Sequence, residues 1–218
     1  MQPASGVPLL PVTDPRTVAF SPEPYPHFEC LEFLDRETTD ALLSWLEARK
    51  WLELGLDGYE GYSDIPLSAS ILPEPCCGIL APDFLLQLRQ LMSRFFRIES
   101  AGNVRVTAHR ILSGGSLRPH SDVSRMPFTH RLLIQLNRGW TQENGGFLCL
   151  YDGAPCANQK ARKLVAPIHR SAFGFEISER SFHSVTPVTG STRYTLSYTF
   201  YPPENGEAHE QSRTPESL

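Results

Sequence analysis

Two histidines and one aspartate have the residue types and spacing of an iron site. His120 and Asp122 are separated by a single residue, so in an extended strand their side chains lie on the same face. His183 follows later in the chain. Two imidazoles and one carboxylate can hold one face of ferrous iron and leave the remaining positions open for oxygen and a co-substrate. The sequence therefore predicts a non-haem Fe(II) site made by His120, Asp122 and His183.

Arg193 adds a permanent positive charge to this set. Its planar guanidinium can bind a carboxylate through two parallel hydrogen bonds, which a lysine ammonium cannot do. We therefore expect Arg193 to bind the remote carboxylate of an oxoacid co-substrate. The alternative is a structural ion pair with an acidic residue. An HxD triplet is common by chance, so the prediction of an oxygenase depends on all four residues together.

Length, charge and cysteine content narrow the class of protein. A chain of 218 residues suits one domain, and a net charge of −4 gives no electrostatic reason to expect nucleic acid as the main partner. The five cysteines contain no CxxC pair, which favours reduced thiols and a cytoplasmic location. No signal-peptide pattern or bilayer-spanning apolar run is present, so we expect a soluble protein without a membrane partner.

Helices are expected first along the chain, and strands after them. Apolar residues recur at helical spacing from Asp35 to about Lys50 and from Pro82 to about Arg97. Residues 55–80 between them are rich in glycine, serine and proline, and we expect a long surface excursion, either a lid or a plain connector. Short β-type runs then predict an all-β sandwich or barrel. These runs are 103–112, 117–122, 129–137, 146–151, 162–168, 171–177, 182–188 and 192–201.

Composition also suggests domain boundaries. Residues 1–22 and 203–218 are rich in proline and polar or small residues, so we expect disordered tails there. The single domain would then span residues 23–202. It would have helical support from residues 35–97 and a β core from residues 103–201.

The β region resembles a known enzyme family along residues 103–201. The motifs that carry this resemblance are Arg118-Pro119-His120-Ser121-Asp122, Leu136-Asn137, Gly145-Gly146-Phe147-Leu148 and Phe182-His183-Ser184-Val185-Thr186-Pro187-Val188. In their order, they are similar to the Fe(II)- and 2-oxoglutarate-dependent dioxygenases, specifically the small prolyl-hydroxylase-like branch. The resemblance implies a mainly β fold with supporting N-terminal helices, a double-stranded β-helix or jelly roll. It also implies Fe(II), 2-oxoglutarate and O2 as cofactor and co-substrates, with ascorbate as a stimulant.

The resemblance implies roles for individual residues as well. His120, Asp122 and His183 would bind iron, and Arg193 would bind 2-oxoglutarate. Strand alternation would direct Thr195 beside Arg193, where its hydroxyl could be a second donor to the co-substrate carboxylate. Gln135 stands near a position where many relatives have a tyrosine that assists this arginine. A core amide with local partners is the alternative for Gln135.

Substrate contacts are harder to assign, because they depend on strand register. His109, Arg110 and Arg131 lie on strands expected to approach the pocket, but the sequence leaves their direction open. We expect Arg110 or Arg131 to touch the substrate, and the alternative is solvated arginines. His130 and His169 have no matched carboxylate, so they are interpreted as surface histidines.

The predicted reaction is hydroxylation of an unactivated C–H bond, with release of succinate and CO2. The resemblance favours an amino acid, a peptidyl residue or a related small molecule as substrate. A carboxylate at Asp122, rather than alanine or glycine, favours hydroxylation over halogenation. Two alternatives remain: a nucleic-acid demethylase of the alkylation-repair type, suggested by Arg193-Tyr194-Thr195-Leu196, and a non-catalytic metal-binding jelly-roll protein. The sequence determines neither the particular substrate nor the oligomeric state.

Overall fold

The computed structural model describes residues 18–52, 55–97, 102–123, 127–157 and 159–203. The described chain is mainly antiparallel β, with two α-helices ahead of most of the strands, as predicted. The predicted tails fall largely outside the described residues. The strands are β1 (Ala19–Ser21), β2 (His27–Cys30), β3 (Tyr59–Pro66), β4 (Val104–His120), β5 (His130–Gln135), β6 (Leu148–Leu150), β7 (Lys163–Val165), β8 (Ala172–Glu176), β9 (His183–Val185) and β10 (Arg193–Phe200).

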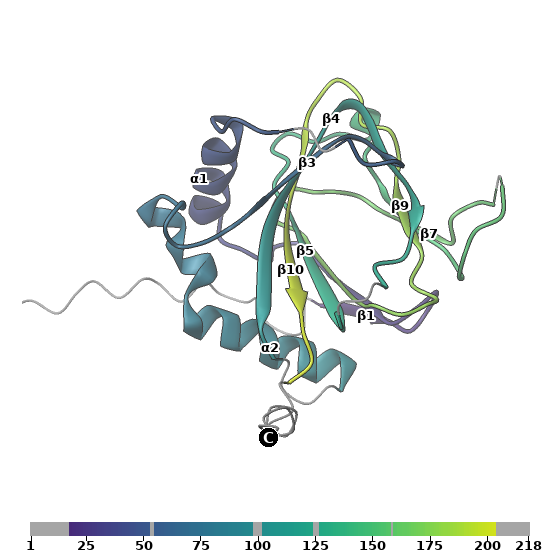
Figure 1. The fold of residues 1–218 in the computed structure, drawn as a ribbon, viewed down its shortest axis with the longest axis horizontal. Helices are drawn as coiled ribbons and strands as arrows, with labels where there is room; N and C mark the ends of the chain where they lie inside the picture. Colours follow the sequence, from purple (N-terminus) through teal and green to yellow (C-terminus); the bar gives the residue numbers. More distant parts are fainter. Residues whose placement is uncertain (1–17, 53–54, 98–101, 124–126, 158, 204–218) are drawn as a thin grey trace, which may run out of the picture.

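The long strand β4 connects two layers of one continuous sheet. Residues 104–111 of β4 pair with β10, whereas Leu117 and His120 pair with β9. We call β2, β8, β5, β10 and residues 104–111 the major layer, and β9, β6, β7 and residues 117–120 the minor layer. Figure 1 shows the strands of the two layers on opposite sides of the β region. The runs predicted separately at 103–112 and 117–122 are therefore one bent strand.

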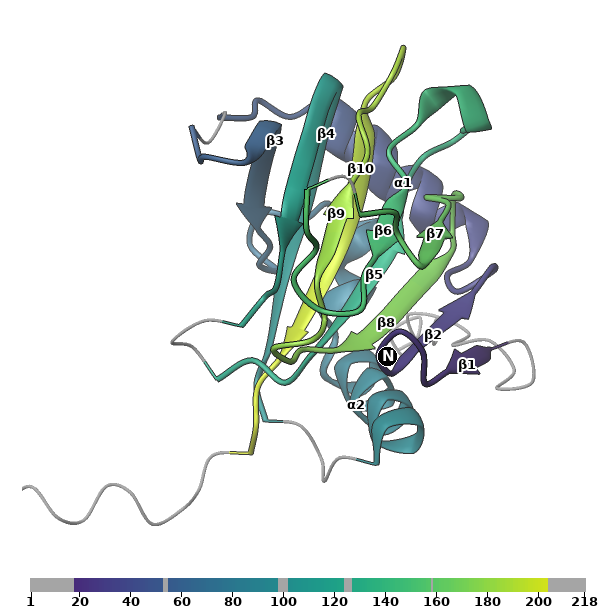
Figure 2. The same cartoon turned by 90° about the vertical axis from the view of Figure 1, so that its right-hand side faces the viewer.

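Helices α1 (Arg36–Glu47) and α2 (Pro82–Phe96) lie on the outer side of the major layer (Figures 1 and 2). Helix α1 begins where the Asp35 side chain accepts the Thr38 backbone N–H at 2.8 Å, and it ends before the predicted Lys50. Proline at the first position of α2 costs no helical hydrogen bond. The described helices include none that is long and apolar enough to cross a membrane.

Alternation along β10 separates the hydrophobic core from the opposite, inner face of the sheet. The odd-numbered residues of β10 lie on the inner face, whereas the even-numbered ones pack in the core with both helices. Tyr198, for example, is fully buried, lies against the Phe84 ring of α2 and donates its hydroxyl to the Ile79 carbonyl. The helices therefore cover one face of the sheet and leave the other free to form a site.

The expectation of an irregular surface excursion over residues 55–80 is wrong. Residues 59–66 form β3, which pairs with β4, and Glu74–Leu80 forms a 3-10 helix with Cys76 and Ile79 fully buried. A bulge between Glu60 and Tyr62 breaks the simple alternation, which hides the strand from a period of two. Gly61 has a φ of 62°, which favours glycine at this bulge.

Part of the predicted N-terminal tail is also structured. Ala19–Ser21 forms β1, which pairs with β2 through the register Ala19 with Glu29 and Ser21 with His27. The composition of the segment is that of a tail, but β2 supplies hydrogen-bond partners that no local pattern can reveal. Residues 1–17 and 204–218 lie outside the described residues.

His130 is a buried residue, contrary to the sequence interpretation. It is 3% exposed at the start of β5, and its ring lies 4.7 Å from the Phe96 ring of α2. Both ring nitrogens are buried, and neither has a hydrogen-bond partner in the described part of the chain. The expected surface position is wrong because α2 covers the outer face of β5 at this point.

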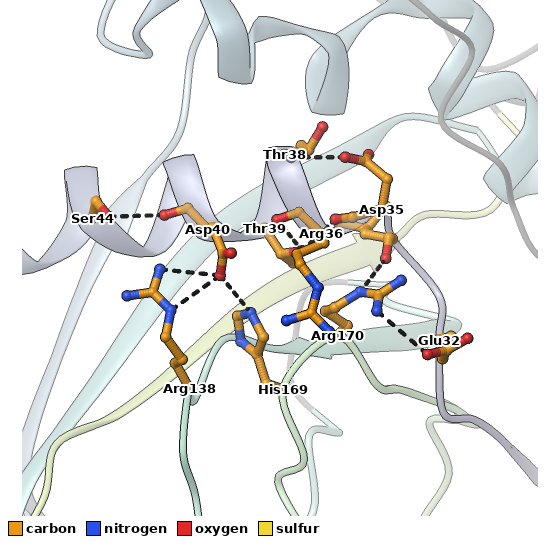
Figure 3. Close-up of polar contacts among 11 residues, drawn as sticks. Glu32, Asp35, Arg36, Thr38, Thr39, Asp40, Ser44, Arg138, His169 and Arg170 are labelled. Carbon is orange, nitrogen blue, oxygen red and sulfur yellow. Dashed lines mark hydrogen bonds and ion pairs between the residues drawn. The ribbon is translucent and has the colours of Figure 1, made fainter.

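A polar cluster fastens α1 to loops of the sheet (Figure 3). Asp40 of α1 accepts hydrogen bonds from both Arg138 Nε, at 3.1 Å, and Arg138 Nη2, at 3.0 Å. The same carboxylate oxygen lies 3.1 Å from His169 Nε2. His169 was expected at the surface, yet its side chain is only 11% exposed. One α1 carboxylate thus joins the β5–β6 and β7–β8 connections.

Candidate active site

The three side chains expected to bind iron converge between the two layers. His120 ends β4 and His183 begins β9, and the two are register partners in the minor layer. One ligand atom from each of His120, Asp122 and His183 lies within 4.8 Å of the others. Asp122 follows the end of β4, so it does not share an extended strand with His120. The sequence argument that two residues at this spacing lie on one face of a strand therefore does not hold here. Convergence of Asp122 depends instead on the path of the chain after β4.

Each histidine is oriented by a carbonyl two residues before it. Nδ1 of His120 lies 2.8 Å from the Arg118 carbonyl, and Nδ1 of His183 lies 3.0 Å from the Ser181 carbonyl. Because a carbonyl only accepts, Nδ1 donates, and Nε2 of a neutral ring keeps its lone pair. Burial lowers the pKa of His183 to about 4, so this ring is neutral near pH 7. Both rings are therefore set to offer Nε2 to a metal ion.

Asp122 supplies a buried carboxylate beside these rings. Burial by itself would raise the pKa of Asp122, but the positive charge of Arg131 and the nearby histidines outweigh it and lower the pKa. Asp122 Oδ1 accepts a hydrogen bond from Arg131 Nη1 at 2.9 Å. Asp122 Oδ2 is buried without a hydrogen-bond partner in the described chain and lies 3.6 Å from His183 Nε2. An anionic oxygen in this position fits a divalent cation, because a buried charge needs a partner.

Arg193 lies at the start of β10 in a tightly defined position. It is 6% exposed, its Nε donates to the Gly146 carbonyl at 3.0 Å, and its Nη1 donates to the Thr195 hydroxyl at 2.6 Å. Thr195 in turn donates to Gln135 Oε1 at 3.0 Å. Gln135 therefore contacts Thr195, and the three side chains form one buried hydrogen-bonded chain.

Gly146 provides the space that Arg193 occupies. A Cβ at Gly146 would lie 3.0 Å from Arg193 Cδ and 3.3 Å from Val188 Cγ2. Its φ of 69° also favours glycine. The Gly145-Gly146 pair was expected at a tight strand entry. Gly146 also leaves the space in which the Arg193 side chain lies.

The positive charge of Arg193 is not neutralised by a neighbouring acid. Within residues 18–203 as far as they are described, no carboxylate forms an ion pair with it, so the alternative of a structural ion pair is not what the structure shows. Burial lowers the pKa of Arg193 to about 10, which leaves the guanidinium protonated at neutral pH. A buried cation without an anionic partner fits an anionic ligand such as a carboxylate.

A single cavity of about 260 Å³ joins the arginine to the three converging side chains. Its lining includes both layers of the sheet, with the inner residues of β10 forming part of one wall. A carboxylate bound at Arg193 and a metal ion at Asp122 would therefore share one cavity. The lining residues are Leu56, Tyr59, Tyr62, Asp64, Arg105, Thr107, His109, Leu117, His120, Asp122, Phe128, Arg131, Leu133, Leu148, His183, Val185, Arg193, Thr195, Ser197 and Thr199.

Strand register decides which of His109, Arg110 and Arg131, whose direction the sequence left open, face this cavity. His109 lines it, whereas Arg110 does not: the Arg110 guanidinium lies 5.1 Å from the Trp51 ring centroid, and Nη2 donates to the Ser63 hydroxyl at 3.2 Å. The prediction of a substrate contact at Arg110 is therefore not supported by its position. Arg131 does line the cavity, where it is bonded to Asp122.

Strand β3 contributes cavity residues that the sequence interpretation missed. Tyr59, Tyr62 and Asp64 line the cavity, and the Tyr59 ring lies 5.2 Å from the His120 ring. Arg105 of β4 is a further charged lining residue. The aromatic residues within 59–62 are typical of a strand. The surrounding glycines and the bulge, however, break the alternation from which a strand is predicted.

Part of the chain is similar to a known family. Residues 106–201 match a family model described as the 2OG-Fe(II) oxygenase superfamily. This range contains every residue of the converging set and Arg193 as well. No curated protein sequence matches the chain.

Solved structures share the fold at low sequence identity. A prolyl-4-hydroxylase from Pseudomonas putida aligns with a TM-score of 0.67 and 20% identity, covering 81% of this chain and 92% of that one. A Trichoplax adhaerens prolyl hydroxylase, in complex with a hypoxia inducible factor peptide fragment, gives 0.61 and 18%, with 80% and 83% covered. HygX from Streptomyces hygroscopicus, with nickel and 2-oxoglutarate bound, gives 0.56 and 12%, with 81% and 82% covered. The predicted jelly-roll fold is confirmed.

Proposed function

We propose that this chain, whose residues 106–201 match the family model of the 2OG-Fe(II) oxygenase superfamily, is such an oxygenase and hydroxylates an unactivated C–H bond of an amino acid, a peptidyl residue or a related small molecule. The observation that carries the proposal is the convergence of His120, Asp122 and His183 in one cavity with a buried, unpaired Arg193. When bound, Fe(II) and 2-oxoglutarate supply the oxidation of the C–H bond by O2, with release of succinate and CO2.

In this proposal, His120, Asp122 and His183 hold the iron. The carbonyls of Arg118 and Ser181 keep both imidazoles in the form and orientation that leave Nε2 available. Three protein ligands on one face leave the other face of the ion for the co-substrate and oxygen. The burial of His183 and Asp122 also keeps bulk water away from the reacting atoms.

Arg193 binds the remote carboxylate of 2-oxoglutarate, whereas Thr195, whose hydroxyl donates to Gln135, accepts from Arg193 and positions its guanidinium. Arg193 supplies the charge, and its bonds to Gly146 and Thr195 prevent the guanidinium from turning away. Gln135 accepts from the Thr195 hydroxyl and so orients it, which makes Gln135 a positioning residue for the anchor. The substrate is then left with the part of the cavity that lies away from Arg193.

Charged side chains in the same cavity support a polar substrate. Asp64 and Arg105 both line the cavity, and neither forms an ion pair with another described residue. An amino acid or peptide could place an amine near Asp64 and a carboxylate near Arg105. The fold shared with a prolyl hydroxylase that is in complex with a peptide fragment supports the same substrate class.

The proposal is tested by following 2-oxoglutarate turnover. The purified chain with Fe(II) should produce succinate, and free amino acids and short peptides should stimulate this more than a methylated oligonucleotide does. Stimulation by the oligonucleotide alone would favour the demethylase, and no succinate with any substrate would contradict the proposal.

Asp122→Ala should lose most of this succinate production, because a ligand and its charge disappear together. The matched control is Asp152→Ala, which removes an aspartate that pairs with Arg162 outside the cavity. That control should keep its activity. Wild-type succinate production by Asp122→Ala would remove Asp122 from the metal site.

A further inference from the structure

The three converging side chains are oriented in two different ways. His120 and His183 are each held by a backbone carbonyl of their own strand or its approach, so their orientation follows from the main chain. Among the residues that the structure describes, Asp122 has no such backbone partner, and the bond that orients it comes from the Arg131 side chain at 2.9 Å. Asp122 thus depends on a residue from another strand.

Arg131 is well placed to impose an orientation. Its strand β5 has a neighbour on each side, and Arg131 is the register partner of Thr199 in β10 and of Phe175 in β8. Asp122 follows the end of β4 and is not part of a ladder. The side chains of Arg131 and Asp122 are 18% and 9% exposed, so their bond is largely shielded from water.

We propose that Arg131 is a positioning residue that occupies Asp122 Oδ1 and thereby leaves only Oδ2 to bind the metal ion. The inference rests on the proposed function, because it takes Asp122 as a ligand. The unpartnered Oδ2, 3.6 Å from His183 Nε2, is the atom left on the side of the histidines. A hydrogen bond from Arg131 to Oδ1 favours coordination through Oδ2 alone over chelation through both oxygens, so the positions needed by 2-oxoglutarate and O2 stay open.

The positioning role of Arg131 and its positive charge predict opposite changes in metal affinity when Arg131 is replaced. A guanidinium beside the site repels a divalent cation, so electrostatics alone predicts tighter metal binding without it. Loss of the orienting bond predicts weaker binding, because Asp122 then has to be ordered when the metal binds. The sign of the change therefore distinguishes the two effects.

The test is a Co(II) titration of the whole chain without substrate, followed by the visible absorption of the bound ion. Arg131→Met should weaken Co(II) binding by about 10–100-fold and alter the absorption bands, because Asp122 becomes free to change its binding mode. Arg131→Gln keeps an N–H donor without the charge, and it should stay within about fivefold of wild type. It also keeps the test open if Arg131→Met does not fold, which circular dichroism would show.

A loss of about 10-fold or more in Arg131→Gln would overturn the inference. So would unchanged or tighter Co(II) binding with unchanged bands in Arg131→Met. Such a result would return Arg131 to the substrate-contact role expected from the sequence. Arg110→Met is the matched control, because Arg110 lies outside the cavity and donates to Ser63. It should bind Co(II) as wild type does.

Asp122→Ala separates this inference from the proposed function. If Asp122→Ala weakens Co(II) binding and Arg131→Met does not, the ligand assignment stands and the positioning role fails. If Asp122→Ala leaves Co(II) binding unchanged, the ligand assignment itself fails.

Discussion

Arg193 is a buried charge that is held by hydrogen bonds and has no acidic partner. It is 6% exposed, it donates to the Gly146 carbonyl and the Thr195 hydroxyl, and no acidic residue of the described chain pairs with it. Burial of a charge is unfavourable unless a partner compensates it. A bound carboxylate would provide that compensation, which explains why the surrounding residues hold the guanidinium so closely.

Arg193→Ala should weaken 2-oxoglutarate binding by about 10–100-fold, which corresponds to the roughly 1.5–3 kcal/mol of a charge-assisted hydrogen bond. The measurement is the KM for 2-oxoglutarate, together with its Kd in the Co(II)-loaded protein. Arg110→Ala, which removes an arginine outside the cavity, should leave both values unchanged. An unchanged KM in Arg193→Ala would move the co-substrate anchor to another residue.

Among the elements, α1 is joined to the sheet by the Asp40 cluster as well as by its apolar face. Leu42, Leu43 and Leu46 are buried on that face, and Asp40 binds Arg138 and His169 beside it. The side-chain bonds to Arg138, opposed by slight desolvation and assisted by His169, lower the pKa of Asp40. The helix is thus attached to the β5–β6 and β7–β8 connections, which join the major and minor layers.

Asp40→Ala should reduce the free energy of unfolding by about 1 kcal/mol, because His169 and Arg138 lose a shared acceptor. Urea unfolding at neutral pH measures the change. Asp57→Ala is a matched control, since the Asp57 side chain is 93% exposed and its ion pair with Arg118 should contribute almost nothing. Equal stabilities for the two variants would show that the cluster does not fasten α1.

At the scale of the whole molecule, burial of neutral histidines should make stability depend on pH. Burial lowers the pKa of His130 to about 4, below its ordinary value near 6.5. As pH falls below 6.5, the unfolded chain takes up a proton that the folded chain does not, so the folded state loses stability until the pH reaches about 4. Above pH 6.5 this contribution is constant.

His130→Phe should remove this share of the pH dependence. The aromatic ring keeps its contact with Phe96, while the titrating nitrogens, which have no hydrogen-bond partner among the described residues, are gone. Between pH 7.5 and 5, wild type should lose roughly 2 kcal/mol more unfolding free energy than the variant. The measurement is urea unfolding at both pH values, and parallel losses in the two proteins would contradict a neutral buried His130.

Much of the fold and site follows from local patterns in the sequence. The spacing of His120, Asp122 and His183, the charge of Arg193 and the order of helices before strands are all visible without coordinates. Ligand chemistry depends on side-chain type, and helix or strand periodicity depends on near neighbours. These features therefore predicted helices followed by an all-β sandwich or barrel and the three converging side chains, whereas the jelly roll was implied by the family resemblance.

Tertiary structure alone decided the remaining features. Side chains alternate between the two faces of a strand, and the sequence does not say which set faces inward. Only the pairing of β4 with β3 and β10 shows that His109 rather than Arg110 faces the cavity. The bond between Arg131 and Asp122 likewise joins residues whose positions come from different strands. Such choices depend on long-range hydrogen bonds and packing, which have no counterpart in the local pattern of residues.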